Sequence, residues 1–343
     1  MSKRVLISDP TLRDGNHAVR HQITEASFAS YCAAAEAAGV PIVEVGHGNG
    51  MGASSMLVGE SSLSDETILR VARKNLVKSK LGIHAIPGFC TIQRHLTMAI
   101  ELGVDVFRIA SHCTEADITQ RHIDYVRNQG KEVFGVLMMS HMASPAVLAD
   151  EARKMEAYGA EAVIIMDSAG AYLPADVTER IGALVGALNV PVGFHAHNNL
   201  GMGIANSVAA VDAGATMIDG SARGFGAGAG NAQLEVLVAV FERMGIETGI
   251  DLYKMLDAAD LAEREMIPQL PSISSTSIVS GLAGVFSGFV KQVNSIGSQH
   301  GIDPRDIFFE LGRRNAVAGQ ESLILEVALE LAQKKSSARV AHA

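Results

Sequence analysis

The sequence has 343 residues and a formal net charge of −9, with 48% hydrophobic and 19% charged residues. This composition can fill a large core, which excludes a disordered chain, and the acidic balance disfavours nucleic acid as a partner. The three cysteines form no Cys-x-x-Cys pair, so neither a disulfide framework nor a zinc finger is indicated. The sequence shows no signal peptide and no apolar run that predicts a membrane span. We therefore expect a soluble cytoplasmic protein.

Short apolar runs recur along the chain, and a longer segment with a helical pattern follows each one. The runs are continuously apolar, as strands of a parallel sheet covered by helices on both faces are. Eight such units predict an α/β fold, a (β/α)8 TIM barrel. An open doubly wound sheet is the alternative, weakened because no G-x-G-x-x-G motif follows the first run. The predicted strands are Val5–Ser8, Ile42–Val45, Leu81–Ile86, Val106–Ala110, Val133–Met138, Ala162–Met166, Val192–His195 and Met217–Asp219.

The strand pattern stops near Ile246, and the remainder has the pattern of helices. We predict a catalytic barrel domain over residues 1–250 and a helical C-terminal domain over residues 251–343 that contacts a partner. Within it, Ile278–Val293 is interpreted as a tightly packed buried helix or as part of a subunit contact, and Lys335–Ala343 is expected to fray. The predicted helices are Leu252–Glu265, Ser277–Gly297, Pro304–Leu311 and Gln320–Lys334.

Titratable side chains gather where the predicted strands end, the face on which a (β/α)8 barrel carries its active site. His195 and His197 are two residues apart on an extended segment, so both point to the same side. Asp14 follows the first strand, which lies near the seventh in a closed barrel. Two imidazoles and a carboxylate predict a site for Mn²⁺, Mg²⁺, Co²⁺ or Zn²⁺. The alternative for the two histidines is a hydrogen-bonded pair in a loop.

Arg13 and His17 flank the predicted carboxylate ligand. A guanidinium holds a carboxylate or a developing enolate with forked hydrogen bonds, although an ion pair with Asp9 is the alternative for Arg13. A histidine at this position is a candidate general acid or base, with a loop hydrogen bond as the alternative for His17. No lysine falls at a strand end, so Schiff-base chemistry is disfavoured and a metal would have to act as the electron sink.

The glycine-rich stretch Gly220–Gly230 follows the eighth predicted strand. Backbone N–H groups of such a loop bind phosphate in many barrels, and a close-packed turn is the alternative. Cys90 and Cys113 are expected to be inert. Three further histidines are expected to line the mouth of the barrel: His47, His112 and His141.

The segments DPTLRDG at Asp9–Gly15 and HAHNNLG at His195–Gly201 resemble a superfamily of metal-dependent TIM-barrel lyases and synthases. That superfamily includes isopropylmalate and homocitrate synthases, hydroxymethylglutaryl-CoA lyase and the 4-hydroxy-2-oxovalerate aldolases. The segments VEVGHGNGMGASS, MDSAGAY and GRRNAVAGQE are most similar to the aldolases. The stretch Gly220–Asn231 contains neither the cysteine of the acyl-CoA lyases nor the GERxGN-like loop of the synthases.

This resemblance implies cleavage of a 4-hydroxy-2-oxo acid, such as 4-hydroxy-2-oxovalerate, to pyruvate and a short aldehyde in the catabolism of aromatic hydrocarbons. Arg13 matches the residue that stabilises the pyruvate enolate, His17 the base for the C4 hydroxyl, and Ser168 a contact near the pyruvate carboxylate. The matched metal ligands, for which Mn²⁺ is typical, are Asp14, His195 and His197.

Two positions depart from the family pattern near the substrate. Phe286 stands where the related motif GVYSS has tyrosine, and His84 begins the approach to a Pro-Gly pair that is rich in leucine in the family. We expect both to contact substrate and to affect aldehyde size and stereochemistry. The resemblance also implies an oligomer and an acylating acetaldehyde dehydrogenase partner. The alternatives are a paralogue for a larger acid, a Claisen-type synthase or acyl-CoA lyase, and a barrel kept as a scaffold.

Overall fold

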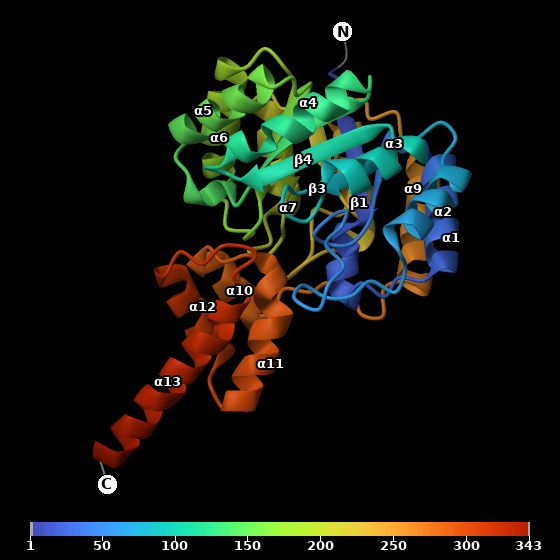
Figure 1. The fold of residues 1–343 in the computed structure, drawn as a ribbon. Coiled ribbons are helices and arrows are strands. Elements are labelled where there is room, and N and C mark those ends of the chain that lie inside the picture. The colour runs from blue at the N-terminus through green and yellow to red at the C-terminus, as the bar shows by residue number, and fades with distance from the viewer. Residues whose placement is uncertain (1–2, 342–343) are drawn as a thin grey trace.

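The structure, a computed structural model, describes residues 3–341. Eight parallel strands close into a barrel in chain order, with β1 hydrogen-bonded to both β2 and β8 (Figure 1). The closed sheet confirms the (β/α)8 barrel and excludes the open doubly wound sheet. The bounds of the strands are β1 Leu6–Leu12, β2 Ile42–Val45, β3 Lys80–Ala85, β4 Val106–His112, β5 Glu132–Met138, β6 Ala162–Asp167, β7 Val192–Ala196 and β8 Met217–Asp219.

Helices follow the strands and cover the outside of the barrel (Figure 1). The first, α1, begins after Thr24, whose side chain accepts the Ser27 N–H, and ends at Gly39 with a left-handed φ of 78°. The outer helices are α1 Glu25–Ala38, α2 Asp65–Asn75, α3 Thr97–Glu101, α4 Gln120–Asn128, α5 Pro145–Ala157, α6 Pro174–Ala187, α7 Gly203–Asp212 and α8 Leu234–Arg243. Short helical turns lie at Asp14–Val19, Ile92–Leu96, Ala116–Thr119, Ser140–Met142, Ala222–Gly224 and Ser287–Phe289.

The barrel interior carries both an apolar and a charged layer. Because side chains alternate along a strand, Val106, Arg108 and Ala110 of β4 share one face. Val106 and Ala110 belong to a buried apolar cluster drawn from several strands, and Arg108 lies between them with 1% of its surface exposed. The charged layer therefore lies inside the barrel, between apolar side chains of the same strand.

The C-terminal helices differ in what they pack against. Helix α9 (Leu252–Glu265) packs on α1 at the outside of the barrel. The helices α10 (Ser275–Ala283), α11 (Val290–His300), α12 (Pro304–Arg313) and α13 (Ser322–Ala341) share an apolar cluster of their own. These four helices lie together at one end of the barrel, and α13 runs away from it (Figure 1). The predicted division at residue 250 stays a prediction.

The single helix predicted over Ser277–Gly297 is wrong. Helix α10 ends at Gly284, which has a φ of 64° and donates its N–H to carbonyls of the preceding turn. The chain then makes the short turn Ser287–Phe289 before α11 begins. Glycine accepts this left-handed conformation at little cost, so Gly284 ends the helix rather than packing within it.

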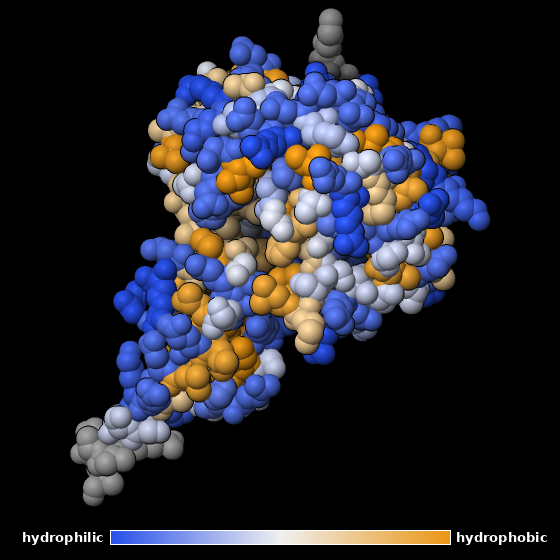
Figure 2. All heavy atoms as spheres, viewed as in Figure 1, coloured by the Kyte–Doolittle hydropathy of each residue, from blue (hydrophilic) through white to orange (hydrophobic). Residues whose placement is uncertain are grey.

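The end of the chain also differs from the expectation of a frayed Lys335–Ala343. Helix α13 continues to Ala341, and residues 342–343 lie outside the described part. Within residues 3–341, no helix combines the length and the apolar character needed to cross a membrane. Hydrophobic side chains gather on the C-terminal helices in Figure 2, and the large exposed apolar residues of this region include Leu282, Phe309, Leu325 and Leu329.

Candidate metal centre

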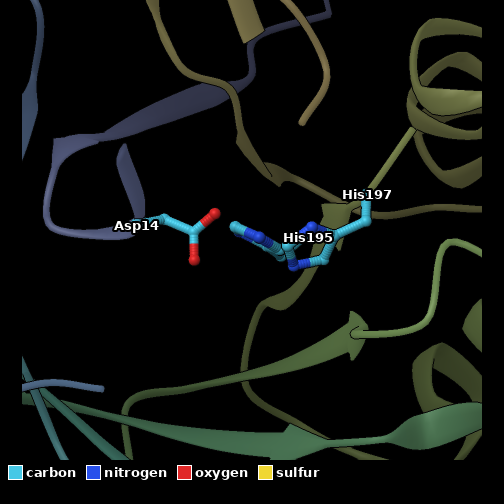
Figure 3. Close-up of side chains that lie close together, drawn as sticks. All are labelled: Asp14, His195 and His197. Atoms are coloured by element: carbon cyan, nitrogen blue, oxygen red, sulfur yellow. The ribbon is translucent and has the colours of Figure 1, made fainter. Parts of the chain in front are cut away.

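Asp14, His195 and His197 come together at the mouth of the barrel. Asp14 opens the turn after β1, His195 is on β7, and His197 follows β7 directly. One potential ligand atom from each lies within 4.8 Å of the others, and all three residues are buried. In Figure 3 the Asp14 carboxylate points toward both rings. The geometry agrees with the prediction that the two histidines project to one side.

The donor atoms of this cluster fit a divalent cation. Among the residues that the structure describes, the buried Nε2 of His195 and Nδ1 of His197 have no hydrogen-bond partner. Buried polar atoms without partners are rare, and a metal ion would satisfy both lone pairs. Imidazole nitrogens with a carboxylate oxygen suit Mn²⁺, Co²⁺ or Zn²⁺, and this donor set does not select one of them.

The electrostatics keep Asp14 and His197 in the protonation states that bind metal. Burial alone would raise the pKa of Asp14, but Arg13 and the nearby histidines outweigh it and hold that pKa far below its usual range. Burial lowers the pKa of His197 to about 4, despite the opposing effect of Asp14. The carboxylate is therefore ionised and the imidazole neutral near pH 7, as metal binding requires.

Two polar residues that the sequence interpretation missed support the ligands. Asp219, at the end of β8, lies with its Oδ2 2.9 Å from Nδ1 of His195. Asn231 donates from Nδ2 to Oδ2 of Asp14 at 2.8 Å. Such partners fix ring orientation and carboxylate position in metal sites. Asp219 could have been recognised as a carboxylate that ends a buried strand, next to the strand of the His-x-His motif.

Arg13 lies against the carboxylate ligand and reaches into the barrel. Its Nη1 donates to Oδ1 of Asp14 at 2.8 Å, and its Nε donates to Oε1 of Glu44 at 2.5 Å. The predicted alternative, an ion pair with Asp9, is wrong because Asp9 accepts instead from Thr11 and Tyr31. Within residues 3–341, the buried Nη2 of Arg13 donates to no protein atom, so one guanidinium nitrogen remains free in a residue that contacts the carboxylate ligand.

His17 lies at the edge of the same mouth, half-buried. It lines a cavity of about 230 Å³ together with Phe286 and Glu321. Its ring meets the Phe286 ring edge-on, with 6.3 Å between centroids. Burial lowers the pKa of His17, which Asp14 only partly opposes, so the imidazole is neutral near pH 7. A neutral imidazole at this position can accept a proton.

Phe286 reaches this cavity because hydrogen bonds fasten the segment after α10 to the barrel. His141 lies with Nε2 2.8 Å from the Gly284 carbonyl oxygen, and Ser287 donates its N–H to the Ser168 carbonyl at 2.9 Å. Asn199 donates from Nδ2 to the Ser287 hydroxyl at 2.9 Å. These contacts place the C-terminal segment, including Phe286, in the wall of the site.

Ser168 and His84 occupy different levels of the barrel. Ser168 accepts the Met139 N–H on its hydroxyl at 3.0 Å and lines a second cavity of about 90 Å³, with Phe286 and Glu321 again in the wall. His84 lies deeper, on β3, with 2% of its surface exposed. Burial, followed by the charge of Arg13, lowers the pKa of His84 to about 3. Its predicted substrate contact would be made from the barrel interior.

The glycine-rich stretch packs directly on the metal ligands. Ala227 donates its N–H to Oδ2 of Asp14 at 3.3 Å, and Ala229 donates to Oδ1 of Asn199 at 2.9 Å. A Cβ on Gly226 would lie 2.6 Å from the same Asp14 oxygen, which is why glycine is needed there. Because these N–H groups bind protein atoms, the structure favours the close-packed turn over a phosphate site.

The remaining predicted residues have structural contacts. Nε2 of His47 lies 2.9 Å from the Gly59 carbonyl oxygen, and Nδ1 of His112 lies 2.9 Å from the Thr114 hydroxyl. Burial raises the pKa of both Cys90 and Cys113 to about 12, consistent with inert thiols.

Comparison with known proteins agrees with this arrangement. The HMGL-like family model matches residues 4–262, which defines the class of barrel, and a DmpG-like communication domain matches residues 271–333. A 4-hydroxy-2-oxovalerate aldolase of Pectobacterium atrosepticum is 70% identical over 98% of both chains. One from Spirochaeta aurantia is 67% identical over 95% of this chain and 96% of its own. The chain therefore belongs to the 4-hydroxy-2-oxovalerate aldolase family, which are lyases.

Solved structures support the fold. The carboxyl transferase domain of Rhizobium etli pyruvate carboxylase, with oxamate and biotin, matches with a TM-score of 0.82. The sequence identity is 17%, and the match covers 97% of this chain and 61% of that chain. At this identity the similarity concerns the fold alone.

Proposed function

We propose that this chain is a divalent-metal-dependent aldolase that cleaves a 4-hydroxy-2-oxo acid, such as 4-hydroxy-2-oxovalerate, to pyruvate and a short aldehyde. The observation that carries the proposal is the buried Asp14–His195–His197 cluster beside the free Nη2 of Arg13. The names of three relatives, each a 4-hydroxy-2-oxovalerate aldolase at 58–70% identity, support the substrate class.

The metal, which we propose to be Mn²⁺, would be held by Asp14, His195 and His197. When bound, it supplies a Lewis acid that polarises the 2-oxo group of the substrate. Ser168 lines the mouth where the substrate carboxylate would lie, and Arg13 presents its free Nη2 to the 2-oxo oxygen. Arg13 thereby stabilises the negative charge that develops on this oxygen as the carbon–carbon bond breaks.

His17 supplies the base. Its neutral imidazole accepts the proton of the C4 hydroxyl, the C3–C4 bond breaks, and the aldehyde carbonyl forms at C4. The bonding electrons pass to C3 and C2 as the enolate of pyruvate, whose C2 oxygen Arg13 holds. A proton added at C3 then gives pyruvate. This assignment uses the cavity position of His17 and its lowered pKa, which keeps the base unprotonated near pH 7.

Phe286 and the C-terminal helices set what happens to the aldehyde. Phe286 lines both cavities at the mouth and would limit the size of the aldehyde group. We propose that an acylating acetaldehyde dehydrogenase binds the C-terminal region. The communication-domain match over residues 271–333 and the exposed apolar side chains on these helices support this partner. Association into an oligomer, a cytoplasmic location and a role in aromatic hydrocarbon catabolism belong to the same proposal.

The experiment is to incubate metal-stripped protein with racemic 4-hydroxy-2-oxopentanoate, with and without Mn²⁺, and to follow pyruvate release. We expect release only with metal, at no more than half of the racemate if one C4 configuration is accepted. Absence of release under both conditions would contradict the proposal. A panel of longer 4-hydroxy-2-oxo acids, together with acetyl-CoA-dependent condensation, would then test the paralogue and synthase alternatives.

A further inference from the structure

A continuous set of buried charges joins the two sides of the candidate metal centre through the barrel interior. It runs from Arg13 to Glu44, from Glu44 to Arg108, and from Arg108 to Asp219, which contacts His195. The successive distances are 2.5 Å for Arg13 Nε to Glu44 Oε1, 3.0 Å for Arg108 Nη1 to Glu44 Oε2, 2.6 Å for Arg108 Nη2 to Asp219 Oδ2 and 2.9 Å for His195 Nδ1 to Asp219 Oδ2.

Arg108 is the centre of this set. It is a large, fully buried side chain, with 1% of its surface exposed, and its two terminal nitrogens contact different carboxylates. A guanidinium can hold two carboxylates at fixed angles because its donors form a rigid planar fork, which an ammonium group lacks. Arg108 contacts neither Asp14 nor the cavity residues in any hydrogen bond or ion pair of the described residues, so it would act through its two neighbours.

Each carboxylate that Arg108 holds contacts a different functional group. Asp219 contacts His195 and thereby fixes the orientation of a metal ligand. Glu44 accepts from Arg13 and thereby fixes the guanidinium, whose Nη2 has no hydrogen-bond partner within residues 3–341. Glu44 and Asp219 are buried, and without a cation between them two like charges would lie unbalanced in the barrel interior.

We infer that Arg108 is a positioning residue. Through Asp219 it fixes the orientation of the proposed metal ligand His195, and through Glu44 it fixes the orientation of Arg13, the proposed enolate-binding residue. The inference rests on the proposed function, because it concerns how that metal site and that arginine are held. Its distinctive consequence is that one substitution remote from the cavity weakens two different binding events. Loss of a supporting residue of this kind lowers metal affinity by about 10- to 100-fold.

The test compares Arg108→Met and Arg108→Lys with wild type by calorimetric titration of Mn²⁺ into metal-free protein. A second titration adds oxalate, a planar dianion shaped like the pyruvate enolate, at saturating Mn²⁺. We expect Arg108→Met to lose about 10- to 100-fold in Mn²⁺ affinity and to bind oxalate more weakly as well. Arg108→Lys keeps the positive charge but lacks the planar, forked donors of a guanidinium. We therefore expect it to weaken both Mn²⁺ and oxalate binding, but to a smaller extent.

Two variants that each change one carboxylate partner of Arg108, and one control variant, separate positioning from general destabilisation. Asp219→Asn should weaken mainly Mn²⁺ binding, and Glu44→Gln should weaken mainly oxalate binding. Arg73→Met removes an arginine that pairs with Asp105 away from the site, and it should leave both titrations unchanged whatever its effect on melting temperature.

The inference is overturned if folded Arg108 variants bind both Mn²⁺ and oxalate as wild type does. Should Arg108→Met fail to fold, Arg108→Lys decides by the same criterion. Failure of the wild type to bind Mn²⁺ would remove the proposed function together with this inference. If the wild type binds Mn²⁺ and oxalate and the Arg108 variants bind both equally well, only the inference about Arg108 is contradicted.

Discussion

Nδ1 of His195 carries the hydrogen of this imidazole, because it lies 2.9 Å from Oδ2 of Asp219, a carboxylate that only accepts. Burial would raise the pKa of Asp219, but Arg108 outweighs it and keeps the carboxyl ionised. In the tautomer that this contact favours, the lone pair of the other ring nitrogen, Nε2, is available to the cluster with Asp14 and His197. A residue outside the proposed ligand set therefore sets the tautomer of this candidate metal ligand.

Removal of this carboxylate provides the first prediction. In Asp219→Asn the Nδ1–H of His195 loses its charged partner, so we expect Mn²⁺ affinity to fall by about 10- to 100-fold. Calorimetric titration of metal-free protein measures the change. Asp105→Asn, which removes an aspartate paired with Arg73 away from the site, is the control and should bind Mn²⁺ normally. Equal affinities for Asp219→Asn and wild type would show that the contact has no role in metal binding.

Asp14→Ala should abolish metal binding and activity together. The substitution removes the single carboxylate of the cluster and leaves two imidazoles, one ligand short of the three protein ligands that a catalytic metal site uses. Metal content after dialysis against Mn²⁺ measures the loss, and retention of one equivalent in Asp14→Ala would place the metal elsewhere. Asp176→Asn, on an outer helix, is the control because its carboxylate caps the N-terminus of α6 and is not one of the three clustered residues.

His17→Ala should keep the metal but lose turnover. The imidazole lies in the cavity wall rather than among the ligands, so Mn²⁺ affinity should match the wild type. Loss of a general base lowers kcat by about 10²- to 10⁴-fold, with a smaller effect on KM. Steady-state kinetics of pyruvate release make the comparison, and an unchanged kcat would remove His17 from the mechanism.

The pH dependence of kcat/KM follows from the buried environment of His17. Burial disfavours the imidazolium form and lowers the pKa below its usual 6.5, and a general base acts only when unprotonated. The ratio kcat/KM should therefore decline on an acidic limb centred below pH 6.5, as the pH drops through this lowered pKa. An acidic limb centred at or above pH 6.5 would contradict the assignment. Checking Mn²⁺ content at each pH separates protonation of His17 from loss of metal.

Phe286→Ala should change which aldehyde is produced without affecting the metal. The ring lines both cavities at the mouth and contacts His17 edge-on, so its removal opens space beside the C4 substituent. We expect kcat/KM for longer 4-hydroxy-2-oxo acids to rise relative to the pentanoate substrate, by about 10-fold or more per accommodated methylene. Phe289→Ala is unsuitable as a control because it opens the same cavity. Phe309→Ala, on an exposed position of α12, should leave the preference unchanged.

The barrel was predictable because its strands are local apolar runs with a regular spacing. The predicted bounds of Ile42–Val45 and Met217–Asp219 agree with β2 and β8. The predicted cluster also came from local signals, since His195 and His197 are two residues apart and Asp14 directly follows a strand. What the sequence did not show is which strands face which across the barrel, because side-chain contacts of high sequence separation leave no local pattern.

The interior charges illustrate this limit. Glu44 interrupts the apolar run IVEV and Arg108 interrupts VFRIAS, and a charge at an inward position of a buried strand requires a partner. That signal was present, but it could not say that Glu44 and Asp219 are the partners of Arg108. The helix predicted over Ser277–Gly297 was wrong because a local pattern was misleading. The helical pattern of the sequence continues through Gly284, but the backbone ends the helix there.

A crystal structure of the protein grown with Mn²⁺ and oxalate, with anomalous scattering recorded for manganese, tests the proposed reaction centre most directly. We predict one manganese peak bound by Asp14, Nε2 of His195 and a ring nitrogen of His197, with oxalate on the open positions and Arg13 Nη2 within hydrogen-bond distance of it. A manganese site elsewhere, or oxalate bound away from Arg13, would contradict the central claim that these residues form the reaction centre.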